Sequence, residues 1–502
     1  MSQSIYLRDL PCYKEASEEK QKKIPGLLDH YVYDFSNLPT DGLKKELSDF
    51  IKYRGEHCKL SSMCSEYSTF KLFCRFIYER EKELHSYLER SEAEWENRLK
   101  AWLLSNGYAI TSNHYMNVNG KTKIGQPMAV SFLKKLLCFL EPEDSRDERE
   151  KDIWQLDKLP IAVKQNPIKP VRRINFTKIL QPQIREEVKQ CCYLQLRYLA
   201  IGSINAELTA MRRFSAFLAE EFPDVLSLAN LKRIHIEEYL IYINTDVSDK
   251  QFFHSELSYL KTVIDEVGRI IEQTSLSNLF LPGDIPKSRK ILFRAYSDAE
   301  LKRLNSHIVK MDEQIARALI IHQMLGTRIS DSLSLPMEGC LYEEDGQYMI
   351  RVEQVKNGFF SKTICEETAA LIQKSIDYTK ERYGDVHYIF VNEGDLSRPI
   401  SYGMIRERVL IMIRELDLRD DYGELFNFES HMFRHSYGQR LTEMHLEDET
   451  IAQMLGQRGL QTVHCYRRMG DKVLADETRE MRSIMDDILS EMIKEWDGYE
   501  EI

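Results

Sequence analysis

Four segments between residues 325 and 469 carry side chains that could act together on a phosphodiester. They hold Arg328 in LGTRISDSLSL, Lys356 in VEQVKNGFFSK, His431 and Arg434 in HMFRHSYGQRL, and Tyr466 in MLGQRGLQTVHCYRRM. A phosphodiester is anionic, and a pentacoordinate transition state places more charge on its non-bridging oxygens. Two guanidinium groups can bind those oxygens bidentately, which a lysine cannot do. Because tyrosine has an ordinary pKa of about 10, its attack requires removal of the proton in a cationic surround.

Each of these residues also has an ordinary structural explanation. An arginine on a helix is usually a surface residue, and a tyrosine before two arginines is more often a packing residue than a nucleophile. His431, Arg434 and His435 share a helix face at spacings i, i+3 and i+4, where they could cap the helix or form salt bridges. The prediction therefore depends on the combination and its order, not on any one motif.

In that combination the chain resembles the tyrosine recombinase (phage integrase) family. The family pattern is Arg, Lys, His-x-x-Arg, a further His or Trp, and then Tyr. Its closing motif is matched by Leu455, Gly456, Thr462 and Tyr466. The resemblance covers about residues 290 to 470 well and residues 170 to 285 loosely, and it does not cover the first 160 residues.

The resemblance implies a role for each side chain. Arg328 and Arg434 bind the phosphate, and His431 assists proton transfer. Lys356, on a hairpin that can reach the minor groove, protonates the departing 5′-hydroxyl. Tyr466 holds the DNA as a 3′-phosphotyrosine. Because this ester conserves the bond energy, religation needs no ATP, no metal and no other cofactor.

Three positions bear on this assignment. Gln457 stands where most family members have His or Trp; its amide can donate a hydrogen bond to a phosphate oxygen but cannot exchange a proton at neutral pH. With Gln in place of His or Trp at this position, we expect strand cleavage to be retained but slower. Lys362 is an alternative to Lys356, although Lys356 aligns better. Tyr437 is a poorer nucleophile candidate because its helix already presents Arg434.

The composition describes a soluble, multidomain protein rich in helices. Of 502 residues, 69 are Lys or Arg and 80 are Asp or Glu, which gives a formal net charge of −11. Hydrophobic residues make up 43%, and only 22 glycines and 14 prolines are present, which favours two or three domains with long helices. The acidic total argues weakly against nucleic acid, but the clustering of basic residues matters more.

The sequence predicts a cytoplasmic protein without a membrane span or a metal. No apolar stretch reaches the roughly 20 residues that cross a bilayer, and the charged start is not a secretory signal. The ten cysteines are scattered, as expected for reduced thiols. His57, Cys58, Cys64 and Cys74 could be offered as a zinc cluster, but they contain no Cys-x-x-Cys pair.

Hydrophobic periodicity divides the chain into three predicted domains. Residues 1–160 form an additional helical domain, with helices expected over residues 20–35, 42–53, 66–106 and 128–142. Residues 170–285 form a helical core-binding domain that contacts DNA, with helices expected over residues 183–201, 205–222, 233–245 and 252–273.

Residues 290–502 are predicted to form an α+β catalytic domain with a small antiparallel sheet, so that the fold class of the whole chain is mainly α. Ser297 and Glu300 suit a capping box at its first helix. A hairpin is expected over residues 347–367, a strand over residues 386–392, and helices from Met404 onward. The tail after Tyr466 carries an apolar stripe at helical spacing, which suits packing on its own domain or docking on a neighbouring protomer.

Two basic runs lie beside proline-containing breaks at the borders of the middle domain. They are Lys164, Lys169, Arg172 and Arg173, and then Lys287, Arg289, Lys290 and Arg294. Solvated linkers explain them equally well. If they cross a DNA backbone, they position the protein without reading sequence.

These features predict a site-specific recombinase or integrase that cuts and rejoins double-stranded DNA, four protomers pairing two sites. The long N-terminal part favours a mobile-element enzyme. A type IB topoisomerase shares the same residue set and would act as a monomer. A catalytically weak DNA-binding regulator of the same family is the other alternative, suggested by Gln457 and the acidic charge.

Overall fold

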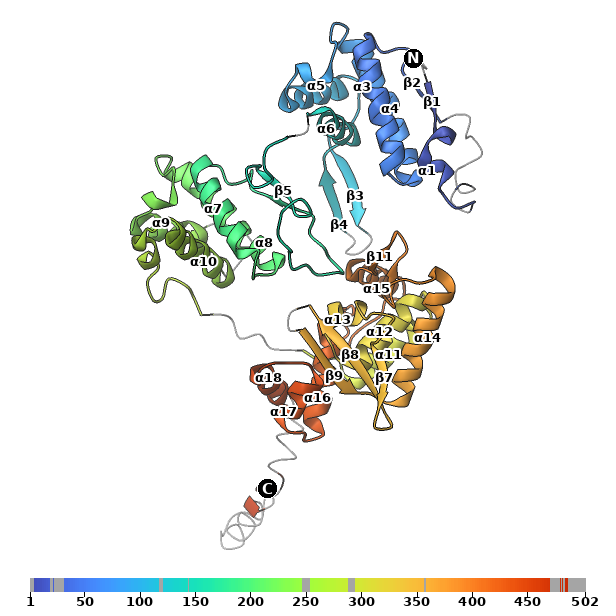
Figure 1. Ribbon diagram of the computed structural model, residues 1–502, viewed down its shortest axis with the longest axis vertical. Coiled ribbons are helices and arrows are strands. Elements are labelled where there is room, and N and C mark those ends of the chain that lie inside the picture. Colours follow the sequence, from blue (N-terminus) through green and yellow to red (C-terminus); the bar gives the residue numbers. More distant parts are fainter. Residues whose placement is uncertain are drawn as a thin grey trace, which may run out of the picture. The chain divides into compact units, whose positions relative to one another are not determined.

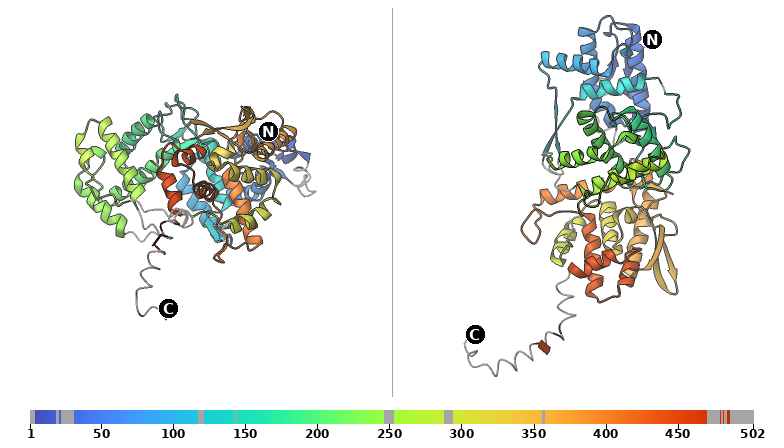
Figure 2. Two further views of the ribbon diagram at one scale, coloured as in Figure 1. Left: turned by 90° about the horizontal axis from the view of Figure 1, so that it is seen from below. Right: turned by 90° about the vertical axis from the view of Figure 1, so that its left-hand side faces the viewer.

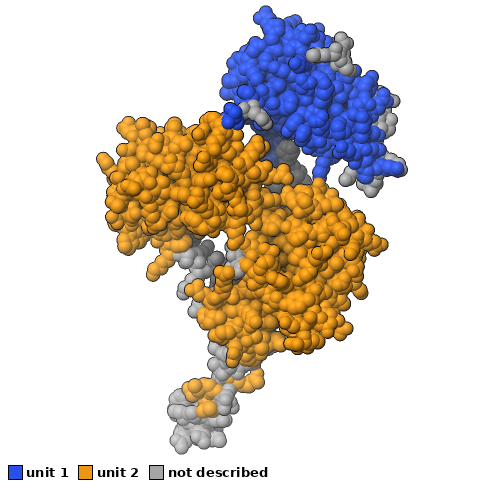
Figure 3. Space-filling model, viewed as in Figure 1, with its two compact units in different colours: residues 1–145 blue, residues 146–502 orange. Residues whose placement is uncertain are grey.

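The computed structural model describes residues 4–18, 21, 31–116, 121–142, 144–245, 253–287, 294–355, 358–469, 479, 481 and 484–485. The chain forms two compact units, residues 1–145 and residues 146–502 (Figure 3). Within the described ranges the chain is mainly helical and its sheets are small and antiparallel, which confirms the predicted fold class (Figure 1). In this part of the chain no helix is long and apolar enough to cross a membrane.

The first unit is built on four main helices around an aromatic core. They are α3 (Asp41–His57), α4 (Leu60–Arg80), α5 (Glu92–Ser105) and α6 (Met128–Leu140). Their apolar faces bury Phe73, Phe76 and Trp95 almost completely. Two strand pairs accompany them, β1 (Ser4–Tyr6) with β2 (Val32–Asp34) and β3 (Ser112–Met116) with β4 (Lys121–Gly125).

Two helix predictions for this unit are wrong. A helix is expected over residues 20–35, but residues 32–34 form strand β2 instead. Tyr33 and Phe35 are both buried and lie two positions apart, which is the spacing of one face of a strand. Residues 22–30 lie outside the described ranges. The single helix expected over residues 66–106 is interrupted between α4 and α5. There the buried carboxylate of Glu81 pairs with Arg90 and Arg98 and holds the chain reversal.

The second unit contains the four predicted helices of the middle block, which confirms them. They are α7 (Pro182–Gln195), α8 (Ile201–Glu221), α9 (Arg233–Thr245) and α10 (His254–Ile270), drawn in green in Figure 2. They share one hydrophobic core with the small pair β5 (Ile153–Gln155) and β6 (Arg173–Asn175). The division of this unit at about residue 285 into two domains stays a prediction.

The remaining part of the second unit, residues 294–469, is called the C-terminal block. It begins with α11 (Asp298–Ile308), where the predicted capping box between Ser297 and Glu300 is present. A three-stranded antiparallel sheet contains the predicted hairpin, β8 (Gln347–Gln354) with β9 (Gly358–Thr363), and β7 (Leu341–Glu344) as an unpredicted third strand. The strand expected over residues 386–392 is shorter, β10 (Val391–Asn392), paired with β11 (Asp395–Pro399). The helices of this block are α12 (Glu313–Leu325), α13 (Ile329–Leu333), α14 (Glu366–Tyr383), α15 (Tyr402–Glu415), α16 (Ser430–Glu443), α17 (Asp448–Met454) and α18 (Gln461–Met469).

Candidate active site

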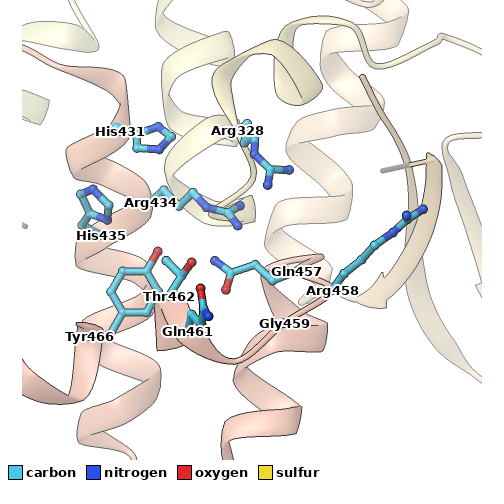
Figure 4. A pocket seen from close by; sticks show the side chains of 10 residues that line it. All are labelled: Arg328, His431, Arg434, His435, Gln457, Arg458, Gly459, Gln461, Thr462 and Tyr466. Carbon is cyan, nitrogen blue, oxygen red and sulfur yellow. The ribbon is translucent and has the colours of Figure 1, made fainter. Parts of the chain in front are cut away.

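One pocket in the C-terminal block brings together five of the six predicted catalytic residues (Figure 4). It is lined by Arg328, His431, Arg434, His435, Gln457, Arg458, Gly459, Gln461, Thr462 and Tyr466. These side chains come from the start of α13, from α16, and from the turn and helix that follow α17. The sixth, Lys356, lies outside the described residues. Segments more than a hundred positions apart in the sequence therefore meet at one site.

Arg328 reaches the pocket from the turn between α12 and α13. Gly326 ends α12 in a left-handed conformation at φ 59°, which turns the chain so that Arg328 becomes the N-cap of α13. Arg328 Nη1 is buried, lies 3.8 Å from Asp331 Oδ2, and has no hydrogen-bond partner among the described residues. A buried guanidinium N–H without an acceptor is prepared to receive an anion.

Asp331 is a site residue that we did not predict. It is almost fully buried, and burial raises the pKa of its carboxyl group against the opposing effect of Ser330 and Arg328. Its Oδ1 accepts a hydrogen bond from Ser330 Oγ at 3.0 Å. The sequence does carry a signal, an aspartate three residues after the arginine on the same short helix, and this spacing could have drawn attention to it.

Arg434 is held in place by two main-chain carbonyls. Its Nη1 donates to the carbonyl of Gly326 and its Nη2 donates to that of Leu455, each at 2.9 Å. Only 3% of the residue is exposed. Burial lowers the pKa of the guanidinium, while the phenol of Tyr466 acts in the opposite direction. Of its five N–H donors two serve the protein fold, so others remain for a phosphate.

Tyr466 lines the pocket from α18 although it is fully buried by its own domain. Its ring belongs to a small hydrophobic core with Leu455 and Val463, and it lies 5.7 Å from the ring of His435. Gly438 on α16 makes this position possible, since a Cβ there would come to 2.8 Å from two ring carbons of Tyr466. We did not predict a role for Gly438, because its effect depends on a contact between two helices.

Two histidines on successive turns of α16 border the site. His431 is exposed at the rim, and its ring lies 5.2 Å from the buried ring of His435. Burial, His431 and Arg434 together lower the pKa of His435 to about 4, which keeps that ring neutral near pH 7. Opposite them, Gln457 Oε1 is buried and has no hydrogen-bond partner within the described ranges.

A buried chain of hydrogen bonds connects the Arg328 turn to the start of α16. The hydroxyls of Thr327 and Ser332 lie 2.5 Å apart, and Ser332 Oγ is 2.9 Å from His322 Nδ1. His322 Nε2 is 3.1 Å from the carbonyl of Ser430, next to His431. Because a carbonyl only accepts, Nε2 carries the proton and Nδ1 accepts from Ser332. Burial lowers the pKa of His322 to about 4, in agreement with a neutral ring.

The two alternatives raised from the sequence, Lys362 and Tyr437, do not line this pocket. Lys362 is buried and donates to the hydroxyl of Tyr437 at 3.3 Å. Both residues line a different pocket, together with Met324, Cys365 and Met454. Among the described residues, no group of three or more His, Cys, Asp and Glu side chains is arranged to hold a metal ion.

The predicted DNA-binding residues lie outside the pocket. Arg172, Arg173 and Lys287 are exposed. Arg294 donates to Glu300 at 2.8 Å and to Asp420 at 3.0 Å, so its charge already has two carboxylate partners within the protein. Arg289 and Lys290 are not among the described residues. The role of this set stays a prediction.

Comparisons with known proteins bear on most of the chain, including the part that holds the pocket. Residues 296–472 match the model of the phage integrase family. The chain is 27% identical over 386 residues to transposase B from transposon PsiTn554 of Staphylococcus aureus, and 26% identical to transposase B from transposon Tn554 of Staphylococcus aureus strain Mu50. Each alignment covers 75% of this chain and 61% of the relative, so the chain spans less than two thirds of the length of these relatives.

Solved structures with some similarity include XerH site-specific recombinase bound to palindromic difH substrate, at 17% identity and a TM-score of 0.43, covering 60% of this chain and 91% of that chain. The Tn1549 transposon integrase in complex with transposon right end DNA matches at 14% identity and a TM-score of 0.42, covering 59% of this chain and 99% of that chain. The family match includes every segment that lines the pocket. Through residues 296–472, this chain therefore carries a phage integrase (tyrosine recombinase) family domain.

Proposed function

We propose that this protein is a site-specific DNA recombinase of a mobile element, which cuts and rejoins DNA strands through a covalent bond to Tyr466. The observation that carries the proposal is the convergence of Arg328, Arg434, Gln457 and Tyr466 on one pocket. In that pocket Arg328 Nη1 and Gln457 Oε1 are buried without partners in the described part of the chain. A phosphodiester supplies the acceptor that the guanidinium lacks, and its oxygens can also accept from the amide of Gln457 after a side-chain rotation.

The reaction follows from the positions of these groups. The Tyr466 oxygen attacks phosphorus, its proton leaves toward His431, and the bond from phosphorus to the 5′-oxygen breaks. Arg328 and Arg434 bind the non-bridging oxygens as charge builds on them. The departing 5′-oxygen takes a proton, which the resemblance assigns to Lys356. Religation runs the same steps in reverse with another 5′-hydroxyl.

Gln457 replaces the usual proton-exchanging side chain with a neutral amide. It can stabilise a non-bridging oxygen but cannot relay a proton. Proton transfer at Tyr466 therefore depends on His431, which is exposed and borders the same pocket. This division of roles predicts that His431 is more important here than in a site that has a histidine in place of Gln457.

The substrate we propose is double-stranded DNA, with four protomers on two sites. The similarity to the two Staphylococcus transposases supports a role in transposition. Arg172, Arg173 and Lys287 are exposed and could contact the DNA backbone, with the helices of residues 182–270 as the core-binding domain. The first domain would contact DNA further from the crossover or mediate assembly. The cysteines whose side chains the structure describes are free thiols, which fits a cytoplasmic enzyme.

The test is covalent trapping on nicked duplexes drawn from the ends of the element, from which the short 5′-hydroxyl fragment diffuses away. The expected product is a 3′-phosphate adduct on Tyr466 that Tyr466→Phe does not form. An adduct on Tyr437 instead would contradict the assigned nucleophile. Binding of the same DNA without any adduct would favour the regulator. Relaxation of supercoiled DNA by a monomer, with no joining of two sites, would favour the topoisomerase.

A further inference from the structure

Lys362 occupies an unusual position for a lysine. It is the fully buried residue of strand β9, with 4% of its surface exposed. Its ammonium group has no carboxylate partner in the described part of the chain. Instead it donates to the carbonyls of Leu325 and Met454, the latter at 3.2 Å. It also lies 4.7 Å from the centre of the Tyr437 ring. Lysine is almost never buried in this way unless its charge is compensated.

The compensation comes from two helix ends. Leu325 is the last residue of α12 and Met454 is the last residue of α17. The carbonyls at a helix C-terminus lack partners within the helix and carry the negative end of the helix dipole. Two such ends therefore converge on one ammonium group, which satisfies their carbonyls and neutralises part of its charge.

Arg434 repeats this arrangement one residue further along both helices. It donates to the carbonyls of Gly326 and Leu455, the residues that follow Leu325 and Met454. Two buried cations, from β9 and α16, thus bridge the same pair of helix ends in parallel. Arg434 also lines the pocket that contains Tyr466, whereas Lys362 lines a different pocket.

The two bridged helix ends lead directly into the site. Arg328 follows the end of α12 by three residues, and Gln457 follows the end of α17 by three residues. The separation of these helix ends therefore sets the separation of the two groups that face the phosphate. A change of this separation by a fraction of an ångström would weaken contacts made in the transition state.

We propose that Lys362 is a positioning residue, which together with Arg434 fastens the ends of α12 and α17 and so holds Arg328 and Gln457 at the spacing that a phosphodiester requires. This inference rests on the proposed function. It gives Lys362 a role different from that of a general acid, because the ammonium is directed at main-chain carbonyls and not into the pocket.

The experiment compares cleavage of two nicked duplexes, one with the normal 5′-oxygen at the scissile phosphate and one with a 5′-bridging sulfur. A thiol leaves without being protonated, so it rescues the loss of a general acid but not the loss of a positioning contact. Lys362→Met is expected to slow adduct formation on Tyr466 about tenfold or more on both duplexes alike, with DNA affinity little changed. Lys362→Arg is expected to restore part of the rate, and Lys374→Met, at an exposed lysine on α14, serves as the matched control.

Amide hydrogen exchange gives a readout that does not depend on activity. In Lys362→Met the amides of residues 326 and 455–457 are expected to exchange faster, with those of α14 unchanged. If Lys362→Met cleaves the 5′-sulfur duplex at the wild-type rate, Lys362 is the general acid and the positioning role is wrong. If the variant changes neither the cleavage rates nor the amide exchange, Lys362 has no positioning role. If Lys362→Met does not fold, the same comparisons on Lys362→Arg decide. Absence of an adduct in the wild type would contradict the proposed function, and exchange would still test the bridge.

Discussion

Gly438 lies against the aromatic ring of Tyr466, so closely that a Cβ on Gly438 would come to 2.8 Å from the ring carbons Cδ2 and Cε2. The candidate nucleophile is thus held between α18, which carries it, and a position on α16 that has no side chain. The helix that supplies His431 and Arg434 also determines where the phenol lies.

Gly438→Val is expected to reduce the rate of adduct formation on Tyr466 at least about tenfold, because the buried ring must move away from the pocket. DNA binding is expected to stay within about twofold. The measurement is single-turnover trapping on a nicked duplex. Gly403→Val on α15 is the control, since a Cβ there meets only the Ser401 hydroxyl at 4.0 Å. Equal rates in the two variants would contradict the assigned contact.

Arg328→Lys is expected to slow cleavage by about 10²- to 10³-fold, because one ammonium replaces a guanidinium that can bind two phosphate oxygens. Folding is expected to be unaffected, since Arg328 Nη1 has no hydrogen-bond partner in the described part of the protein. A time course of covalent trapping, quenched at successive times with protein in saturating excess over DNA, measures the rate of the chemical step. Arg382→Lys, at an exposed arginine on α14, should leave the rate unchanged. A similar loss of rate in this control would mean that the effect is not specific to the Arg328 guanidinium.

The neutral ring of His322 predicts a dependence of stability on pH. Burial lowers its pKa from the ordinary 6.5 to about 4 in the folded state. The unfolded chain therefore binds the proton first, so the contribution of His322 is complete above pH 6.5 and is lost as the pH falls toward 4. The full loss amounts to about 3 kcal/mol. Urea unfolding of wild type and His322→Gln, followed between pH 7 and 4, should show the weaker dependence in the variant.

Glu207 is a buried carboxylate in the core of the four-helix block. Only 3% of it is exposed, its Oε2 has no hydrogen-bond partner in the described ranges, and burial raises its pKa above the ordinary value. Its favourable contribution is complete below pH 4.5 and is lost as the pH rises through the raised pKa. Glu207→Gln is therefore expected to raise the unfolding temperature of this block at pH 7 in calorimetry. Glu221→Gln, at an exposed glutamate on α8, should not.

Local sequence signals predicted much of the architecture. The four helices α7 to α10 and the capping box at Ser297 follow from apolar periodicity and from a serine three positions before a glutamate. The same reasoning failed where burial of single groups decided the path of the chain. Tyr33 is buried in the strand pair of β1 and β2, where a helix was expected. Glu81 forms a buried ion pair with Arg90 at the end of α4, where the expected helix should have continued.

The sequence by itself determined which chemistry we propose for this protein. Arg328, His431, Arg434 and Tyr466, in that order, carry the resemblance that implies phosphoryl transfer through a covalent tyrosine. Order and residue type can be read from the sequence, because charge and nucleophilicity are properties of the side chains themselves.

Only the tertiary structure decided how those groups are held. The contact of Gly438 with Tyr466, and the bridge from Lys362 and Arg434 to the ends of α12 and α17, join segments far apart in the chain. Such contacts leave no local pattern, because burial and the approach of one backbone to another arise only when the helices pack. The structure therefore shows Lys362, an alternative acid in the sequence analysis, donating to main-chain carbonyls and not lining the pocket that contains Tyr466.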